Sequence, residues 1–175
     1  MRFRIHHPLF VGFLGVVGLL VALVVALVGT GLRPQLLGLT RAEVDRQLQL
    51  AGLILENTPP SADPDSLTDL LQSRLRHRVS LIDADGRLVG DSELTPAQLR
   101  EAENHRDRPE VAAATAGATG YAERFSNTLG LDLLYVAETV SWGEREVVLR
   151  LAAPLGGIDL TLRRARRAVA YAGLA

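Results

Sequence analysis

The chain begins with one long apolar run, and shorter segments of mixed character follow it. No residue between His7 and Arg33 can carry a charge. About 20 apolar residues, rising about 1.5 Å each in a helix, cross a bilayer core of roughly 30 Å. The pattern therefore predicts a transmembrane helix over residues 9–32, preceded by a short N-terminal segment over residues 1–8.

The charges around this run predict its orientation. Arg2 and Arg4 precede it and no acidic residue does, so the positive-inside rule places residues 1–8 in the cytoplasm and the chain after Arg33 outside. Two alternatives stay open. A cleaved signal peptide is disfavoured because its apolar core spans only about 7–15 residues. The opposite orientation gains support from the arginines within residues 163–167.

A second helix is predicted directly after the apolar run, over residues 33–57. Thr40 and Glu43 have the spacing of a capping box that would start it. One face repeats apolar residues at helical spacing, namely Val44, Leu48, Ala51 and Leu55. Its place beside the membrane segment suits a helix that carries motion across the bilayer, and its apolar face suits packing on a domain core.

Further helices are expected at several capping patterns along the chain. They begin near Ser66, near Thr95 and near Asp107, the last with Asp107 and Glu110 as its cap. A final helix is expected over residues 158–172.

Five segments have the alternation and the residue content of strands. They cover residues 78–83, 87–90, 121–126, 131–140 and 145–153. Asp85-Gly86 predicts a hairpin turn between the first two, and Trp142 lies in the loop between the last two, where we expect it to be exposed. The last strand alternates apolar and polar residues, which predicts one wet face. Antiparallel strands with helices between and around them predict an α+β domain over residues 66–155.

Composition excludes several classes of function. The chain has 19 basic and 20 acidic residues and a net charge of −1, so its charge does not indicate a nucleic-acid partner. It has no cysteine, which excludes disulfides, thiolate metal sites and a cysteine nucleophile. No glycine-rich phosphate loop or serine nucleophile elbow occurs in the sequence. The sequence therefore predicts no catalytic residue and no cofactor.

One histidine stands among acidic residues. His105 has Glu101, Glu103 and Asp107 nearby in the sequence, which is compatible with a divalent-metal site or a pH sensor. A single imidazole with scattered carboxylates is a poor ligand set, so a surface histidine is the preferred interpretation. No metal site is predicted.

Five strings of residues resemble a known family. They are residues 79–86, residues 103–111, residues 128–130, the string Leu-Tyr-Val-Ala over residues 134–137, and residues 148–155. Together with the apolar N-terminal helix, they resemble the N-terminal sensor region of phosphate-regulon-type and related transmembrane sensor histidine kinases. The resemblance implies an extracytoplasmic PAS-like (Cache-like) domain, anchored by a single pass in the bacterial cell membrane and paired as a homodimer.

Such kinases continue beyond the region that this chain covers. A second membrane helix, a linker, a phospho-acceptor histidine and an ATP-binding domain follow the sensor domain in that family. Residues 158–175 resemble a C-terminal helix leading into a second membrane segment, so we expect a fragment or a truncated product. ATP, Mg²⁺ and a response-regulator partner are implied only for the kinase domain, and the chain alone is expected to be inactive as a kinase.

The family-like strings supply the candidate ligand-binding residues, which are Asn104, His105, Arg108 and Tyr135. They line a ligand pocket over the sheet or serve as capping and packing residues. The second interpretation is preferred because Asp107 and Glu110 resemble a helix cap. The predicted function is signal sensing for a two-component phosphorelay. The alternatives are a membrane-anchored binding or interaction module and the sensor region of a chemoreceptor or a cyclase.

Overall fold

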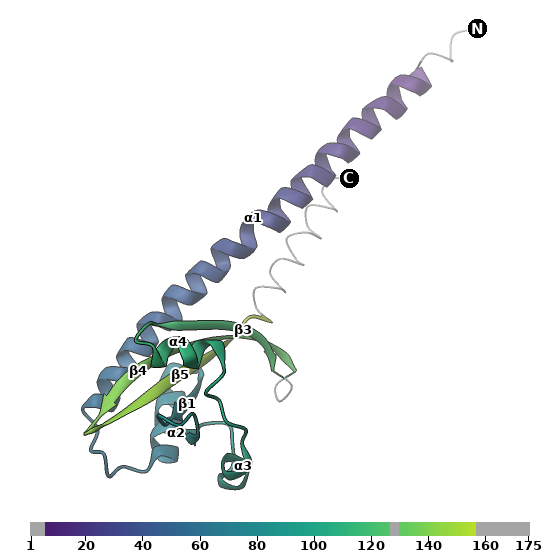
Figure 1. The fold of residues 1–175 in the computed structure, drawn as a ribbon. Coiled ribbons are helices and arrows are strands. Elements are labelled where there is room, and N and C mark those ends of the chain that lie inside the picture. The colour runs from purple at the N-terminus through teal and green to yellow at the C-terminus, as the bar shows by residue number, and fades with distance from the viewer. Residues whose placement is uncertain (1–5, 127–129, 157–175) are drawn as a thin grey trace. The chain divides into compact units, whose positions relative to one another are not determined.

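A computed structural model describes residues 6–126 and 130–156 of the chain (Figure 1). These residues fall into two compact units, which are described separately. One unit includes Met1–Leu39 and the other is Thr40–Gly156. The final helix expected over residues 158–172 lies outside the described residues.

A single helix, α1 (His6–Glu56), covers both the predicted membrane segment over residues 9–32 and the helix predicted over residues 33–57. The capping pattern at Thr40 and Glu43 therefore does not start a helix. Residues before Thr40 are already helical, so the N–H groups that a cap would serve have carbonyl partners within the helix. Within the described residues, none of the helices combines the length and the apolar character that crossing a membrane requires. The membrane anchor stays a prediction.

The second unit is an α+β domain built on one sheet. Its further helices are α2 (Pro64–Leu75), α3 (Pro96–Glu101) and α4 (Pro109–Thr115). Its strands are β1 (Arg78–Ile82), β2 (Leu88–Asp91), β3 (Gly120–Ser126), β4 (Leu131–Trp142) and β5 (Arg145–Pro154). The five strands run antiparallel to their neighbours in the order β2-β1-β5-β4-β3. The predicted five-stranded antiparallel sheet flanked by helices is confirmed.

The starts of the short helices follow local capping chemistry. α2 begins slightly before the expected position because the Asp63 carboxylate accepts a hydrogen bond from the Ser66 backbone N–H at 2.9 Å. α3 begins as predicted, with Thr95 and Gln98 forming a complete capping box.

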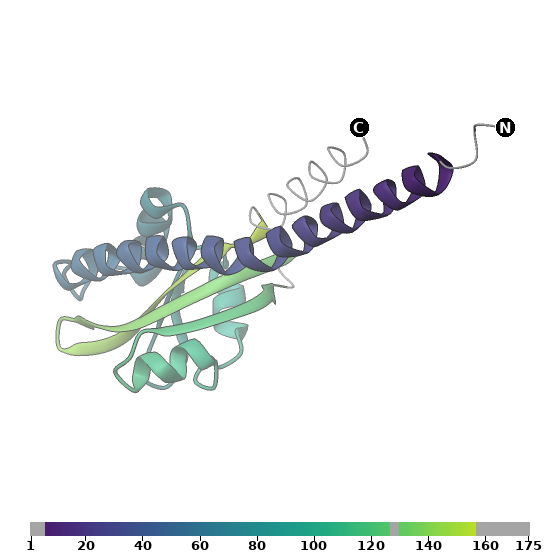
Figure 2. The same ribbon diagram turned by 90° about the horizontal axis from the view of Figure 1, so that it is seen from above.

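Helices cover both faces of the sheet. Residues 40–56 of α1 lie along one face and α4 lies on the other (Figure 2). The apolar stripe of α1 is buried as its spacing predicts, at Val44, Leu48, Ala51 and Leu55. On the opposite face, the Thr139 hydroxyl of β4 donates a hydrogen bond to the Ala114 carbonyl of α4 at 2.8 Å. Residues 147–153 of the central strand β5 are consequently buried on both faces, and the expected wet face is wrong.

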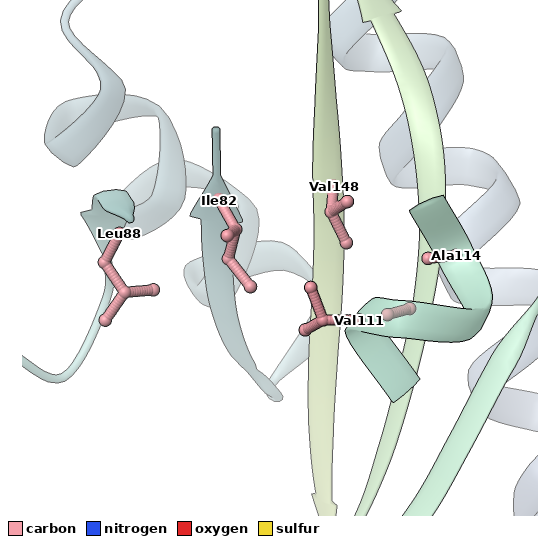
Figure 3. Close-up of a cluster of buried hydrophobic side chains, with 6 residues drawn as sticks. Ile82, Leu88, Val111, Ala114 and Val148 are labelled. Carbon is pink, nitrogen blue, oxygen red and sulfur yellow. The ribbon is translucent and has the colours of Figure 1, made fainter. Parts of the chain in front are cut away.

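The core between α4 and the sheet is small and apolar. It brings together buried side chains from four strands and α4 (Figure 3), namely Ile82, Leu88, Val111, Ala114, Ala137 and Val148. Leu99 and Ala102, from α3 and its C-terminal cap, pack against this cluster. Burying a valine or leucine side chain contributes about 1.5–3 kcal/mol. The cluster therefore holds α3 and α4 on the same face of the sheet.

Trp142 ends β4 and is buried, so the expected exposed position is wrong. Only 3% of its surface is accessible, and its indole Nε1 donates a hydrogen bond to the Thr58 carbonyl at 3.1 Å. The segment after α1 covers the hairpin between β4 and β5, since a Cβ added to Gly143 would lie 2.8 Å from Pro60. The two hydrogen-bonded residues are 84 positions apart, so the residues around the turn could not predict that the segment after α1 buries Trp142.

Candidate functional site

A cluster of charged side chains lies on the face of the sheet that carries α3 and α4. Ser80 of β1 and Arg150 of β5 are paired across their strands and therefore point to the same face. Tyr135 of β4 joins them, with the guanidinium carbons of Arg124 and Arg150 at 4.2 and 5.2 Å from the centre of its ring. These are cation–π distances. The aromatic ring thus contacts two arginines from different strands.

The carboxylate of Glu110, on the first turn of α4, is the centre of this cluster and is fully buried. Arg124 donates two hydrogen bonds to it at 2.8 and 2.7 Å, and Arg150 Nη1 donates a third at 3.4 Å. Burial alone would raise the pKa of Glu110, but the hydrogen bonds from Arg124 and the charges of both arginines hold it below its ordinary value. Glu110 is therefore ionised at neutral pH and ties α4 to the sheet.

The expected helix cap formed by Asp107 and Glu110 is wrong. The residue at the cap position of α4 is Arg108, whose side chain makes no capping hydrogen bond. Glu110 points inward instead. There, two arginines of the sheet supply the charged partners that a buried carboxylate needs. Gly120 permits this close approach, since a Cβ there would lie 2.0 Å from the Glu110 carbonyl oxygen.

A second buried ion pair adjoins the first. Asp91 at the end of β2 accepts hydrogen bonds from Arg78 Nε at 3.0 and 3.2 Å and from the Ser80 hydroxyl at 2.7 Å. Arg150 Nη2 in turn donates a hydrogen bond to the Ser80 oxygen at 3.1 Å. Ser80 therefore joins the two ion pairs, and one continuous polar network runs from β2 to α4.

Arg150 is almost completely buried, with 3% of its surface accessible. Burial lowers the pKa of its guanidinium, against the opposing charges of Glu110 and Asp91. Its Nε has no hydrogen-bond partner among the described residues. A buried donor without an acceptor is costly, especially on a charged group. Arg150 therefore keeps one N–H donor that the described residues do not use.

A cleft of about 350 Å³ opens over the polar network. We call it the arginine cleft, because four arginines line it: Arg78, Arg108, Arg124 and Arg150. An apolar part of its lining is formed by Leu88, Leu94 and Ala102. No aspartate or glutamate occurs among the described residues that line it. Its volume falls in the range of small-molecule sites.

His105 lies at the same cleft, in the loop that joins α3 to α4. Its backbone N–H donates a hydrogen bond to the Gly86 carbonyl at 2.7 Å, which ties the loop to the turn between β1 and β2. Burial, together with the charges of Arg150 and Arg108, lowers the pKa of the imidazole to about 4. His105 is therefore neutral at pH 7, and its buried Nδ1 has no partner among the described residues.

No protein-family model and no curated protein sequence matches this chain. Several solved structures share its fold. The ligand-binding domain of the Campylobacter jejuni chemoreceptor Tlp3, in complex with L-valine, is 10% identical with a TM-score of 0.58, over 89% of this chain and 65% of that one. The sensor domain of the Vibrio cholerae histidine kinase DctB is 17% identical with a TM-score of 0.53, over 73% of this chain and 59% of that one.

The chain shares its fold with sensor domains. An extracellular ligand-binding receptor from Desulfohalobium retbaense is also similar, 14% identical with a TM-score of 0.53 over 75% of this chain. This chain spans 24% of that receptor and less than two thirds of the length of the DctB domain. At these identities the likeness concerns the fold, and it agrees with the PAS-like (Cache-like) architecture that the resemblance implies.

The structure places three of the four predicted ligand-binding residues at the arginine cleft: His105, Arg108 and Tyr135. Asn104 is not among the lining residues. Its side-chain amide donates a hydrogen bond to the Asp85 carbonyl at 2.8 Å and its side-chain oxygen accepts one from the Arg106 N–H at 2.8 Å. Asn104 therefore fixes the loop, and ligand binding by the other three stays a prediction.

Sequence reasoning missed three of the arginines that line the cleft and two polar residues of the network beneath it. The arginines are Arg78, Arg124 and Arg150, and the two polar residues are Ser80 and Asp91. One signal was available: Arg150 interrupts an otherwise apolar stretch over residues 147–153. A lone arginine in a strand buried on both faces requires partners and marks a polar site.

Within the part of the chain that the structure describes, no group of three or more histidine or acidic residues is arranged to hold a metal ion. Of the carboxylates near His105 in the sequence, Glu103 contacts Arg108 at 3.3 Å and is largely exposed. The chemistry of the cleft is therefore that of cationic hydrogen-bond donors.

Proposed function

We propose that this chain is the extracytoplasmic sensing part of a membrane-anchored receptor and that its arginine cleft binds the signal molecule. The cleft itself carries the proposal: it lies in a fold shared with sensor domains and contains a buried guanidinium nitrogen without a partner among the described residues. A ligand bound between α3, α4 and β5 would favour one arrangement of these elements over another, which is how binding shifts a two-state receptor.

For the output we propose a two-component phosphorelay. The DctB structure is the sensor domain of a histidine kinase, and the sequence resembles phosphate-regulon-type kinases. In this proposal the chain is a homodimer in the bacterial cell membrane, anchored by residues 9–32. ATP, Mg²⁺ and the response regulator belong to a kinase domain outside these residues. A chemoreceptor output is the second candidate, because Tlp3 is a chemoreceptor.

The proposed placement is tested by labelling single cysteines. The natural chain has no cysteine, so a thiol introduced by Glu144→Cys, at an exposed position in the β4–β5 turn, reports its own surroundings only. We expect a membrane-impermeant maleimide to label Glu144→Cys in intact cells and to label Arg4→Cys only after lysis. Labelling of Arg4→Cys alone in intact cells would contradict the proposed orientation.

The proposed binding role is tested by thermal shift on the full chain in detergent micelles. A panel of small acids, amines and neutral compounds is compared with the buffer. A true ligand at one hundred times its Kd stabilises the folded state by about 2.7 kcal/mol. We expect at least one compound to raise the Tm of the natural chain and to have no effect on Arg150→Met, and a panel without any such compound would contradict the role.

A further inference from the structure

We propose that the arginine cleft selects a small organic acid that carries no positive charge, such as a 2-oxo acid, and rejects the corresponding amino acid. This inference rests on the proposed sensing function of the cleft and names the class of its ligand. The arginines that line the cleft outnumber the carboxylates that pair with them, and those carboxylates are already bound.

The positive and negative charges around the cleft are not equal in number. Four guanidinium groups line the cleft, and only two buried carboxylates, Glu110 and Asp91, lie in the network beneath them. A third carboxylate, Glu103, contacts Arg108 at 3.3 Å from a largely exposed position, where solvent weakens the interaction. The cleft therefore presents an excess of positive charge, and an anion reduces that excess.

Arg150 supplies a donor that lacks a partner. Arg150 is buried, lines the cleft and keeps Nε without a partner among the described residues, while Nη1 and Nη2 bind Glu110 and Ser80. A carboxylate oxygen is the acceptor that a guanidinium N–H binds most strongly. Arg108 lies on the loop beside His105, so a second donor group reaches the cleft from another element.

The apolar part of the lining favours an organic acid over inorganic phosphate. Leu88, Leu94 and Ala102 form an apolar part of the lining. These side chains give no hydrogen bond to inorganic phosphate, whereas they bury the hydrocarbon part of an organic acid favourably. The lining therefore matches a molecule with a carboxylate at one end and a small apolar body.

The charges around the cleft exclude the corresponding amino acid. An ammonium group removed from water needs an anionic or strong acceptor partner. The two carboxylates of the network are already bound, Glu110 by Arg124 in two hydrogen bonds and Asp91 by Arg78 and Ser80. No acidic side chain lies among the described lining residues, and the four guanidinium groups repel the ammonium group.

The experiment compares four probes on the full chain in detergent micelles by titration calorimetry and thermal shift. Three share one carbon skeleton: 3-methyl-2-oxobutanoate is the oxo acid, L-valine has an ammonium group in place of the oxo group, and 3-methyl-2-butanone has a methyl group in place of the carboxylate. Inorganic phosphate is the fourth probe. We expect the oxo acid to bind at millimolar concentration or better, and each of the other three to bind at least about tenfold more weakly, since one charged hydrogen bond is worth that factor.

Variants connect binding to the cleft. Arg150→Met removes the buried donor and should abolish binding of the oxo acid. Arg108→Gln, at a half-buried position on the loop, should weaken binding about tenfold. This variant tests the cleft even if Arg150→Met does not fold. Arg87→Gln makes the same change of charge at an exposed position outside the lining and should bind as the natural chain does.

Several results would overturn the inference. Equal or tighter binding of L-valine, of the ketone or of phosphate contradicts the selected class, and so does oxo-acid binding that Arg108→Gln leaves unchanged. Failure of the oxo acid to bind at millimolar concentration also overturns it. If L-valine or the ketone binds and Arg108→Gln weakens that binding, the sensing role of the cleft stands and only the ligand class is wrong.

Discussion

The guanidinium of Arg124 and the carboxylate of Glu110 form a two-pronged ion pair, with nitrogen–oxygen distances of 2.8 and 2.7 Å. The carboxylate side of this pair is fully buried, and Arg150 approaches it from the central strand. The pair joins α4 to the edge strand β3, so it is part of the support of the arginine cleft as well as of its chemistry.

Replacing Glu110 should destabilise the domain strongly. Glu110→Gln keeps the shape of the side chain but leaves Arg124 and the buried Arg150 without their shared anion. Removing one partner of a buried ion pair costs about 3–5 kcal/mol. Urea unfolding monitored by circular dichroism measures the change. Glu103→Gln, which removes an exposed carboxylate, is the control and should stay within about 0.5 kcal/mol of the natural chain.

The stability of the domain should fall between pH 6.5 and pH 4 because of His105. The folded state lowers the pKa of this imidazole from its ordinary 6.5 to about 4, through burial and then through Arg150 and Arg108, with Glu110 and Asp91 opposing them. As the pH falls through this window, the unfolded chain takes up the proton first, which favours unfolding. Above pH 6.5 the contribution of the neutral imidazole is fully present.

The measurement is the difference in unfolding free energy between the natural chain and His105→Gln as a function of pH. The two proteins share every other titratable group, so only the difference reports His105. Because the imidazole is half exposed, we expect a smaller effect than the full pKa change implies. A difference that stays constant from pH 7 to pH 4 would contradict the assignment.

Gly86→Ala should destabilise the domain by more than the backbone conformation alone explains. Gly86 has φ of +85°, and a Cβ there would lie 2.5 Å from Asn104 Oδ1 and 2.6 Å from the Arg106 backbone nitrogen. Gly117 is the matched control, with φ of +84° and no atom within 4 Å of an added Cβ. Gly117→Ala should cost about 1–2 kcal/mol, the price of the left-handed conformation, and Gly86→Ala should cost clearly more.

The clash of an added Cβ at Gly86 should also affect the cleft. Asn104 and Arg106 flank His105, so displacing them moves the loop that carries His105 and Arg108. Gly86→Ala should therefore weaken binding of any cleft ligand, while Gly117→Ala should not. Equal unfolding free energies for the two variants would show that the loop gives way without cost.

Trp142→Phe should lower the unfolding free energy by about 0.5–1.5 kcal/mol, because it removes the hydrogen bond from the indole Nε1 to the Thr58 carbonyl and keeps an aromatic ring. Trp142 is the single tryptophan of the chain, so its fluorescence reports this contact directly. We expect a blue-shifted emission that acrylamide quenches poorly in the folded state. Emission like that of free tryptophan would contradict the buried position.

The sequence predicted the elements well because their signals are local. The spacing of Val44, Leu48, Ala51 and Leu55 identified the buried face of α1, and alternation with turn residues identified all five strands. The class of the fold followed from the order of these elements. The helices predicted over residues 9–32 and 33–57 form the single helix α1. The capping pattern at Thr40 does not mark its start, since a capping box and a helix interior share residue types.

The candidate site was predicted only in part because its interactions are distant in sequence. Glu110 and Arg150 are 40 positions apart, and Glu110 has the spacing of a helix cap that its tertiary partners override. Arg150 follows a polar alternation that is typical of an exposed strand face, yet α4 covers that face. His105, Arg108 and Tyr135 were found because they lie in strings that resemble a family, whereas Arg124 and Arg78 lie outside any such string.

The sheet order also decides when the cleft can form during folding. β1 pairs with β5, the last strand of the sheet, and Ser80 meets Arg150 across 70 positions of sequence. Contacts of such long separation close late and slow the folding of a domain, whereas the β4–β5 hairpin can form locally. During synthesis on a ribosome, β1 and β2 can pair early, but β1 can pair with β5 only after residues 145–154 have been made. The cleft therefore cannot form before β5 joins the sheet, and a chain interrupted before β5 has Glu110 and Asp91 without the arginine that joins them.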